Sequence, residues 1–178
     1  MATSCTQYAL KGMGQECQGS ASGLKRLLIG VARDWDIVPS SSTTRHLATL
    51  SGTSSASTMF EYYIADESTS LTSTLNINNQ NGVKYYQNVI NATFVRMREE
   101  KHIELQALAN EKLVILVQDN NKSWWAFDNA RATAETAQSG QSFDDLSGYQ
   151  VEISGRNALL PYAVETLPSN ITTPDVYE

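Results

Sequence analysis

Two histidines, His46 and His102, are the side chains best suited to act as a general base at neutral pH. A hydrolase would need such a base beside a nucleophile, together with a group that orients the base. His46 follows a Ser/Thr-rich stretch and His102 lies among charged residues, so we expect both to be solvated. The chain contains neither a Gly-x-Ser-x-Gly elbow nor a phosphate-binding Gly-rich loop with Lys-Ser/Thr. The sequence therefore predicts no enzyme and no catalytic residues.

Paired acids occur twice, as Asp144-Asp145 in a Gly-flanked loop and as Asp66-Glu67 after an expected strand. A calcium loop needs several oxygen ligands at defined spacings, which neither pair supplies. Cys5 and Cys17 lack further ligands nearby, so a zinc site would have to recruit a distant histidine. We expect solvated turns, no metal and no cofactor. The two cysteines fit free thiols better than a disulfide, and both states stay open.

The aromatic run at Trp124, Trp125 and Phe127 is the strongest candidate for binding. Aromatic faces stack on sugar rings, so one hypothesis is a monomeric carbohydrate-binding β-sandwich. Adjacent side chains of a strand point to opposite faces, however, which favours one tryptophan in the core and the other at an interface. We therefore assign these three residues to a subunit interface and keep carbohydrate binding as the alternative.

The charge balance argues against tight binding of nucleic acid. The net charge is −6 and the isoelectric point is near 4.9, whereas phosphate binding needs clustered Lys and Arg. Arg96, Arg98 and Lys101 form a possible basic patch, but three glutamates interleave with them, as on a salt-bridged helix face. An acidic surface would let DNA pass without holding it.

The 178 residues are enough for one domain that buries about 70% of its unfolded surface. We expect an extended arm at 1–23, a mainly β domain at 24–160 and an extended tail at 161–178. The chain shows no charged-then-apolar leader and no apolar run near the roughly 20 residues of a membrane span, so we expect a soluble protein made in the cytoplasm.

The pattern of hydrophobic residues predicts where most strands and the helix lie. A helix is expected at 98–110, and a long hairpin at 70–97 turns at Asn81-Gly82. A second hairpin joins 113–117 to 123–127, and 129–143 is expected to be an edge strand and a loop. Other strands are expected at 24–31, 59–64 and 148–155, with a loop at 50–58. Proline donates no ladder hydrogen bond, so the tail with Pro161, Pro168 and Pro174 is expected outside the central sheet.

The order of these features resembles tail-tube-like virion proteins from phages and prophages of Bacteroidetes, including crAss-like phages. The resemblance covers about 150 residues. It rests on the arm from Cys5 to Gly23, the strands at 24–31 and 88–97, the helix end Leu105-Gln106-Ala107-Leu108-Ala109, the block 113–125, Ser139-Gly140, Asp144-Asp145, and Gly148-Tyr149-Gln150-Val151.

This resemblance implies a β-sandwich or barrel with one flanking helix that assembles into a homo-oligomeric ring. Such rings form a tail tube or the head-to-tail connector, through which double-stranded DNA leaves the capsid. The expected location is the virion, the expected neighbours are other tail or portal proteins, and synthesis takes place in the host bacterial cytoplasm. The ring's copy number stays open.

One face of the long hairpin fits a lumen in such a ring. Its side chains are uncharged hydroxyls and amides, which contact DNA without binding it strongly. The residues that we assign to this lumen face are Thr72, Thr74, Asn76, Asn91 and Thr93.

Overall fold

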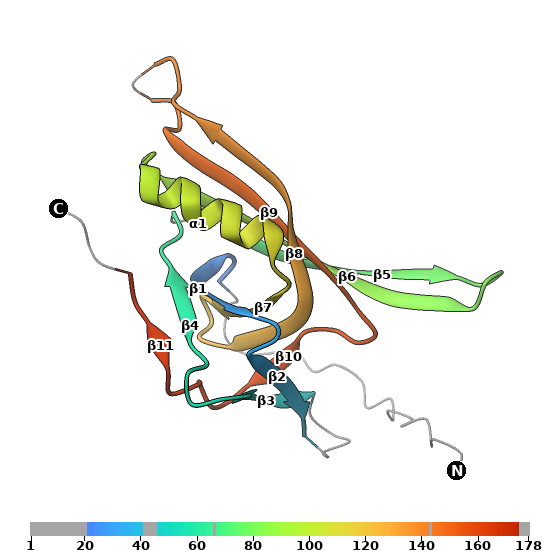
Figure 1. Cartoon of the computed structure of the whole chain (residues 1–178). Helices are drawn as coiled ribbons and strands as arrows, with labels where there is room; N and C mark the ends of the chain where they lie inside the picture. Colours follow the sequence, from blue (N-terminus) through green and yellow to red (C-terminus); the bar gives the residue numbers. More distant parts are fainter. Residues whose placement is uncertain (1–20, 41–45, 66, 143, 175–178) are drawn as a thin grey trace, which may run out of the picture.

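The chain is mainly β, as the sequence predicts (Figure 1). The computed structural model describes residues 21–40, 46–65, 67–142 and 144–174, which contain eleven strands and one helix. The strands are β1 (Leu24–Val31), β2 (Trp35–Pro39), β3 (Leu47–Gly52), β4 (Met59–Tyr62), β5 (Ser70–Asn78), β6 (Val83–Val95), β7 (Leu113–Asp119), β8 (Trp124–Gln138), β9 (Gly148–Asn157), β10 (Tyr162–Val164) and β11 (Ile171–Thr172). The helix is α1 (Glu99–Asn110), close to its expected bounds.

The long strand β8 joins two layers of the sheet. Its residues 124–127 pair with β7 and β10, whereas residues 130–138 pair with β9. The first layer has the order β11-β4-β1-β7-β8-β10-β3-β2, and the second has the order β5-β6-β9-β8. Within the described residues, no pairing joins the end strands β11, β2 and β5 to one another, so the sheet is open. Of the two expected architectures, the closed barrel is therefore not found.

A sharp corner in β8 sends the strand from one layer into the other. Asn129 at the corner has a left-handed φ of 55°, and the register with β7 shifts at the same place. Gly155 of β9 lies against the corner, since a Cβ there would approach the carbonyl oxygen of Asp128 to 3.1 Å. The side-chain amide of Asn129 donates to the carbonyl oxygen of Arg156 at 3.2 Å, which ties the corner to β9.

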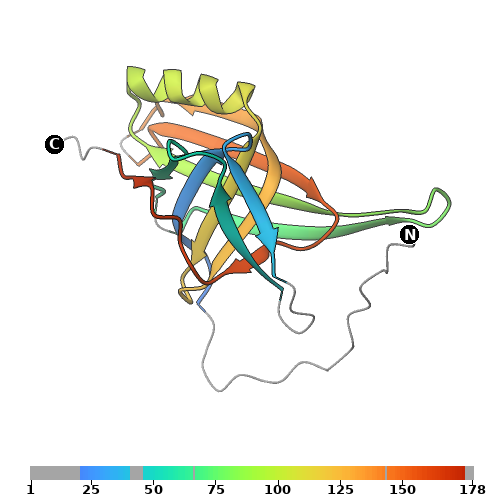
Figure 2. The same cartoon turned by 60° about the horizontal axis from the view of Figure 1, so that its bottom comes forward.

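The main core lies between the two layers and is closed at one end by α1 (Figure 2). A second, smaller core lies on the opposite face of strands β1 and β7. It includes side chains of β2, β3 and β10, which belong to the same layer. Both faces of β7 are thus covered, and residues 113–117 are each at most 1% exposed. This explains why that strand is a continuous apolar run instead of an alternating one.

Apolar and polar contacts hold α1 against the sheet. The only buried side chain of the helix is that of Leu108, which is 5% exposed. The hydroxyl of Tyr149 accepts from the backbone N–H of Arg98 at 3.2 Å and donates to its carbonyl at 3.1 Å. Tyr62 of β4 donates a short hydrogen bond to the carboxylate of Glu104. Polar tethers therefore supplement a small apolar contact.

The structure corrects the expectation for the tail at 161–178. β10 lies between β8 and β3, and β11 pairs with β4, so residues 162–164 and 171–172 belong to the sheet. Pro161 and Pro168 fall outside these two strands, and their missing N–H groups therefore interrupt no ladder. The expectation that the tail stays outside the central sheet is wrong for β10. Residues 1–20 of the expected arm at 1–23 lie outside the described residues.

Two further strands are missed by the sequence patterns. β2 ends in Pro39, and β3 overlaps the expected loop at 50–58. Residues 130–138, expected as a separate edge strand, continue β8 instead. The hairpin of β5 and β6 is found as expected, and its outer half projects well beyond the rest of the molecule (Figure 1).

Candidate functional site

The projecting β5–β6 hairpin is the most distinctive surface of the molecule, and a buried polar chain fixes its root. Asn88 of β6 is 0% exposed and makes two side-chain hydrogen bonds. Its carbonyl oxygen accepts from Ser73 of β5 at 2.7 Å, and its amide donates to Asn157 of β9 at 3.0 Å. The amide of Asn157 donates in turn to Asp128 at the corner of β8. The chain of bonds thus crosses all four strands of the second layer.

The five residues assigned to a lumen face lie on one face of this hairpin. Ser70 pairs with Asn91, so the even-numbered residues of β5 share a face with the odd-numbered residues of β6. Thr72, Thr74 and Asn91 are exposed, while Asn76 and Thr93 are half-buried. The register therefore brings all five together.

The same face continues onto β9 and β8, where the sequence analysis did not place it. Thr93 pairs with Gln150 and Asn91 with Glu152, so the face gains a carboxylate there. At the other end, Arg156 lies 5.6 Å from the centre of the Tyr85 ring. The uncharged surface is thus confined to the hairpin and flanked by charges on β9. Strand alternation alone would have predicted these neighbours once the β6–β9 pairing was known.

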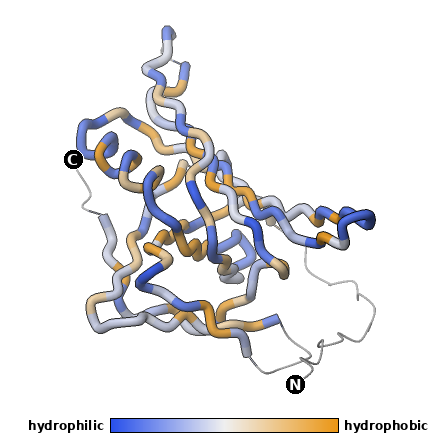
Figure 3. Tube along the Cα trace, turned by 45° about the vertical axis from the view of Figure 1, so that its right-hand side comes forward, coloured by the Kyte–Doolittle hydropathy of each residue, from blue (hydrophilic) through white to orange (hydrophobic). Residues whose placement is uncertain are grey.

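Hydrophobic residues are interspersed along the outer half of the hairpin (Figure 3), and several of their side chains are exposed. β9 ends at Asn157 opposite Tyr86, so beyond this point the hairpin is a ribbon of two strands. Leu75, Ile77 and Val83 are 42%, 58% and 47% exposed. An isolated two-stranded ribbon is at best marginally stable in water, so a ribbon with apolar side chains on both faces favours coverage by a partner.

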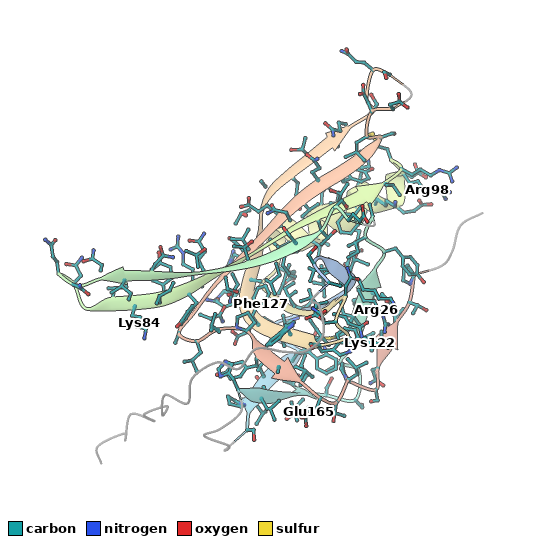
Figure 4. All side chains as sticks on the ribbon, turned by 180° about the vertical axis from the view of Figure 1, so that it is seen from behind. Arg26, Lys84, Arg98, Lys122, Phe127 and Glu165 are labelled. Atoms are coloured by element: carbon teal, nitrogen blue, oxygen red, sulfur yellow. The ribbon has the colours of Figure 1, made fainter. Side chains whose placement is uncertain are left out.

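Only one charged side chain lies between Ser70 and Val95, that of Lys84 near the hairpin end (Figure 4). The outer edge of β5 has no strand partner in the described part of the chain. Its nine residues contain no charge and no proline, and its register with β6 runs without a bulge. By contrast, the edge strand β2 carries Asp36 and Pro39, which discourage pairing.

The aromatic run is divided between the two cores. Trp125 packs against the main core and donates its indole N–H to Asp119 at 3.1 Å. Trp124 packs against the second core, 5.3 Å from the guanidinium of Arg26. The two rings therefore point to opposite faces, as expected, and do not form a common platform for a sugar.

Phe127 requires a correction. Its side chain is 2% exposed and lies inside the main core, well within the body of the molecule (Figure 4). A residue buried against its own chain has no surface to offer a neighbour, so we do not retain Phe127 as an interface residue. Trp124 and Trp125 are half-buried, and whether they contact another subunit stays a prediction.

An ion pair under Trp124 was missed by the sequence analysis. Arg26 binds both carboxylate oxygens of Glu61, with Nε–Oε1 at 2.5 Å and Nη2–Oε2 at 3.0 Å. Glu61 is 8% exposed, and its hydrogen bond raises the pKa of Arg26 against the opposing effect of burial. A buried carboxylate is costly unless a cation is paired with it, and Arg26 is that cation for Glu61. The pair also joins β1 to β4 at the edge of the second core.

The two histidines make separate contacts with their own neighbours. His46 bonds the carbonyl oxygen of Leu160 at 2.8 Å and stacks on Tyr162. Exposed His102 lies edge-on to Tyr149 and borders an open hollow of about 380 Å³ with Met97, Arg98 and Glu99.

The acid pairs and the basic patch likewise form no shared site. Asp145 accepts two backbone N–H bonds at 2.8 Å from its own loop, which lower its pKa. Lys101 donates to the carbonyls of Val95 and Arg96, and burial lowers its pKa. No cluster of three metal-ligating side chains occurs in the described residues. Asp66, Cys5 and Cys17 lie outside them.

The chain matches no family model, no curated protein and no solved structure in the comparisons made. Among the described residues, no helix has the length and apolar character needed to span a membrane.

Proposed function

We propose that the chain is a structural subunit of a bacteriophage virion that forms a ring in the tail tube or the head-to-tail connector, through which DNA passes. The observation that carries the proposal is the long, uncharged edge strand β5 on a hairpin with exposed apolar side chains. Such an edge favours pairing with another chain, and proteins that stay monomeric normally block it. The resemblance to tail-tube-like proteins implies a mainly β fold with one flanking helix, and the described residues are mainly β with one helix.

The second layer has two open edges that fit each other in a ring. β5, β6, β9 and β8 alternate in direction, so the β5 edge and the edge formed by residues 132–138 of β8 run in opposite directions. A β5 edge laid beside the β8 edge of a second copy would continue the antiparallel order with both copies in the same orientation. Repetition of one head-to-tail contact closes a ring when the rotation permits.

The polar face of the hairpin supports a lumen. Thr72, Thr74 and Asn91 are exposed, uncharged and on the same face of the layer. Duplex DNA binds tightly to surfaces whose Lys and Arg displace its counterions. The register also places Val83, Tyr85 and Val89 on this face, so a lumen formed here would carry hydroxyls, amides and uncharged apolar groups. In a protein of net charge −6 such a surface gives DNA little to bind, so DNA can move past it.

Labelled virions test this proposal directly. A phage carrying an epitope-tagged copy of the full chain is purified, and the tag is located by immunogold electron microscopy. The proposal predicts label at the tail or at the junction of head and tail, in several copies per particle. Absence of the chain from purified particles, or label on the capsid shell alone, would contradict it.

A further inference from the structure

We infer that Asn81 in the turn of the projecting hairpin is a site of spontaneous modification, at which the asparagine converts to aspartate and isoaspartate. Asn81 precedes Gly82, and this is the only Asn-Gly pair in the chain. The inference concerns the chemistry of the turn and does not depend on the proposed function.

The reaction needs a backbone nitrogen that can reach the side-chain amide of the preceding residue. The nitrogen of Gly82 attacks Cγ of Asn81 and loses its proton, a new C–N bond forms, and ammonia leaves. Water then opens the resulting five-membered succinimide at either carbonyl. One opening gives aspartate, and the other gives isoaspartate, in which the main chain runs through the side-chain carbon. The balance is asparagine plus water to aspartate plus ammonia, with no oxidant or other reactant.

The structure leaves both reacting groups free. Asn81 and Gly82 are exposed, and within the described residues neither the Asn81 side chain nor the Gly82 N–H makes a hydrogen bond. A Cβ built on Gly82 would meet no atom within 4 Å, so the space beside this residue is open. Asn78 in the same turn differs, because its side-chain oxygen accepts from the N–H groups of Gln80 and Asn81 at 3.1 and 3.3 Å. Sequence and surroundings therefore single out Asn81.

The product changes the charge of the hairpin end. Lys84 is the only charged side chain between Ser70 and Val95, and a new carboxylate at position 81 would lie three residues from it. Isoaspartate also lengthens the backbone by one carbon inside a tight turn. If the proposed function holds, subunits that wait unassembled acquire a charge on the surface that ring formation would cover. Assembled subunits would then be protected when this turn is covered.

Timed incubation of the purified full chain tests the inference. The protein is held at neutral and at mildly alkaline pH, digested, and analysed by tandem mass spectrometry. The peptide that ends at Lys84 should gain about 1 Da at Asn81 and split into two products of equal mass. The rate should rise with pH, because the attacking nitrogen must lose its proton. The other asparagines should change at least several-fold more slowly.

A matched variant separates the site from general ageing. Asn81→Gln keeps an amide at the turn but places it one carbon further from the Gly82 nitrogen. This variant should lose the mass change and release correspondingly less ammonia. An unmodified Asn81 in wild-type protein, or faster change at another asparagine, would overturn the inference. Neither result would bear on ring formation, which a mass measurement of the intact assembly decides.

Discussion

At the scale of single residues, a buried polar side chain decides how the strands of the second layer align. Asn88 interrupts an otherwise apolar series at the inward positions of β6, where Ile90, Ala92 and Phe94 follow it. The residue is tolerated because Ser73 and Asn157 satisfy its side chain. Unlike apolar packing, these bonds exist in one register only, so they fix how β5, β6 and β9 align.

Replacing Asn88 with alanine should lower the free energy of unfolding by about 1–3 kcal/mol, because Ser73 and Asn157 then lose their hydrogen-bond partner at a part-buried position. Urea unfolding followed by tryptophan fluorescence measures the loss. Asn91→Ala on the same strand is the control, since Asn91 is exposed and its replacement should cost less than about 0.5 kcal/mol. Equal stability of the two variants would show that the polar chain does not hold the root of the hairpin.

Tyr62 should make the protein lose stability in alkaline solution. Burial raises the pKa of its hydroxyl above the ordinary value of 10.0, and the hydrogen bond to Glu104 raises it further. Above pH 10.0 the unfolded chain therefore releases this proton while the folded chain keeps it, so stability falls as the pH rises.

The measurement is the free energy of unfolding as a function of pH, compared between wild type and Tyr62→Phe. The variant should be less stable at neutral pH by about 1 kcal/mol for the lost hydrogen bond, and its alkaline fall should be shallower. Tyr63→Phe is the control, because Tyr63 is 57% exposed. Parallel curves for wild type and Tyr62→Phe would contradict the prediction.

At the scale of elements, the unpaired β5 edge and the apolar outer half of the hairpin are the surfaces that we expect to contact another subunit. Leu75 and Ile77 are exposed on one face of the ribbon, so acidic replacements there should leave the fold intact while opposing association. For Leu75→Asp with Ile77→Asp we expect monomers in place of rings and a stability within about 1 kcal/mol of wild type. Light scattering after size-exclusion chromatography reports the mass.

Ile103→Asp provides the matched control, because Ile103 is 71% exposed but lies on α1, away from the hairpin. This variant should assemble like wild type. If both variants assemble equally well, the hairpin is not the contact between subunits.

Local sequence patterns predicted the elements whose signals are strong. The turn at Asn81-Gly82 and the alternation on both sides of it predicted β5 and β6, and the apolar run at 113–117 predicted β7. β10 was missed because three residues after Pro161 carry no periodic signal, and only its pairing with β8 and β3 makes it a strand. The corner at Asn129 was missed for a similar reason, since a bulge depends on the β9 residues beneath it.

Sequence patterns likewise predicted only part of the candidate surface. Alternation along β5 and β6 predicted that the five lumen-face residues share a face, and the register confirms that arrangement. Alternation could not tell that Phe127 is enclosed, because enclosure depends on how β8 folds the second layer over the first. The polar chain through Asn88 likewise joins the β5–β6 hairpin to β8 and β9, which lie far from it in the sequence.

At the scale of the whole molecule, the proposal requires DNA to meet the hairpin face. Thr72→Lys with Thr74→Lys would place two cations per subunit on that face, and a ring repeats them in every copy. Each cation adds an attractive contact to phosphate, so we expect slowed or blocked DNA ejection and at least a tenfold loss of infectivity in assembled particles. Plaque counts per particle and ejection assays measure the effect.

Thr72→Ser with Thr74→Ser is the control for this pair, because it keeps the hydroxyls and adds no charge. Its infectivity should equal that of wild type. Normal infectivity of assembled lysine-variant particles would show that DNA does not pass along this face.

Ring formation is tested most directly by the mass of the purified full chain across a range of concentrations, by native mass spectrometry with electron microscopy of the same sample. We expect a discrete species at a whole-number multiple of 19.6 kDa that appears in micrographs as a closed ring with a central opening. A species of 19.6 kDa that persists at the highest concentration would contradict it.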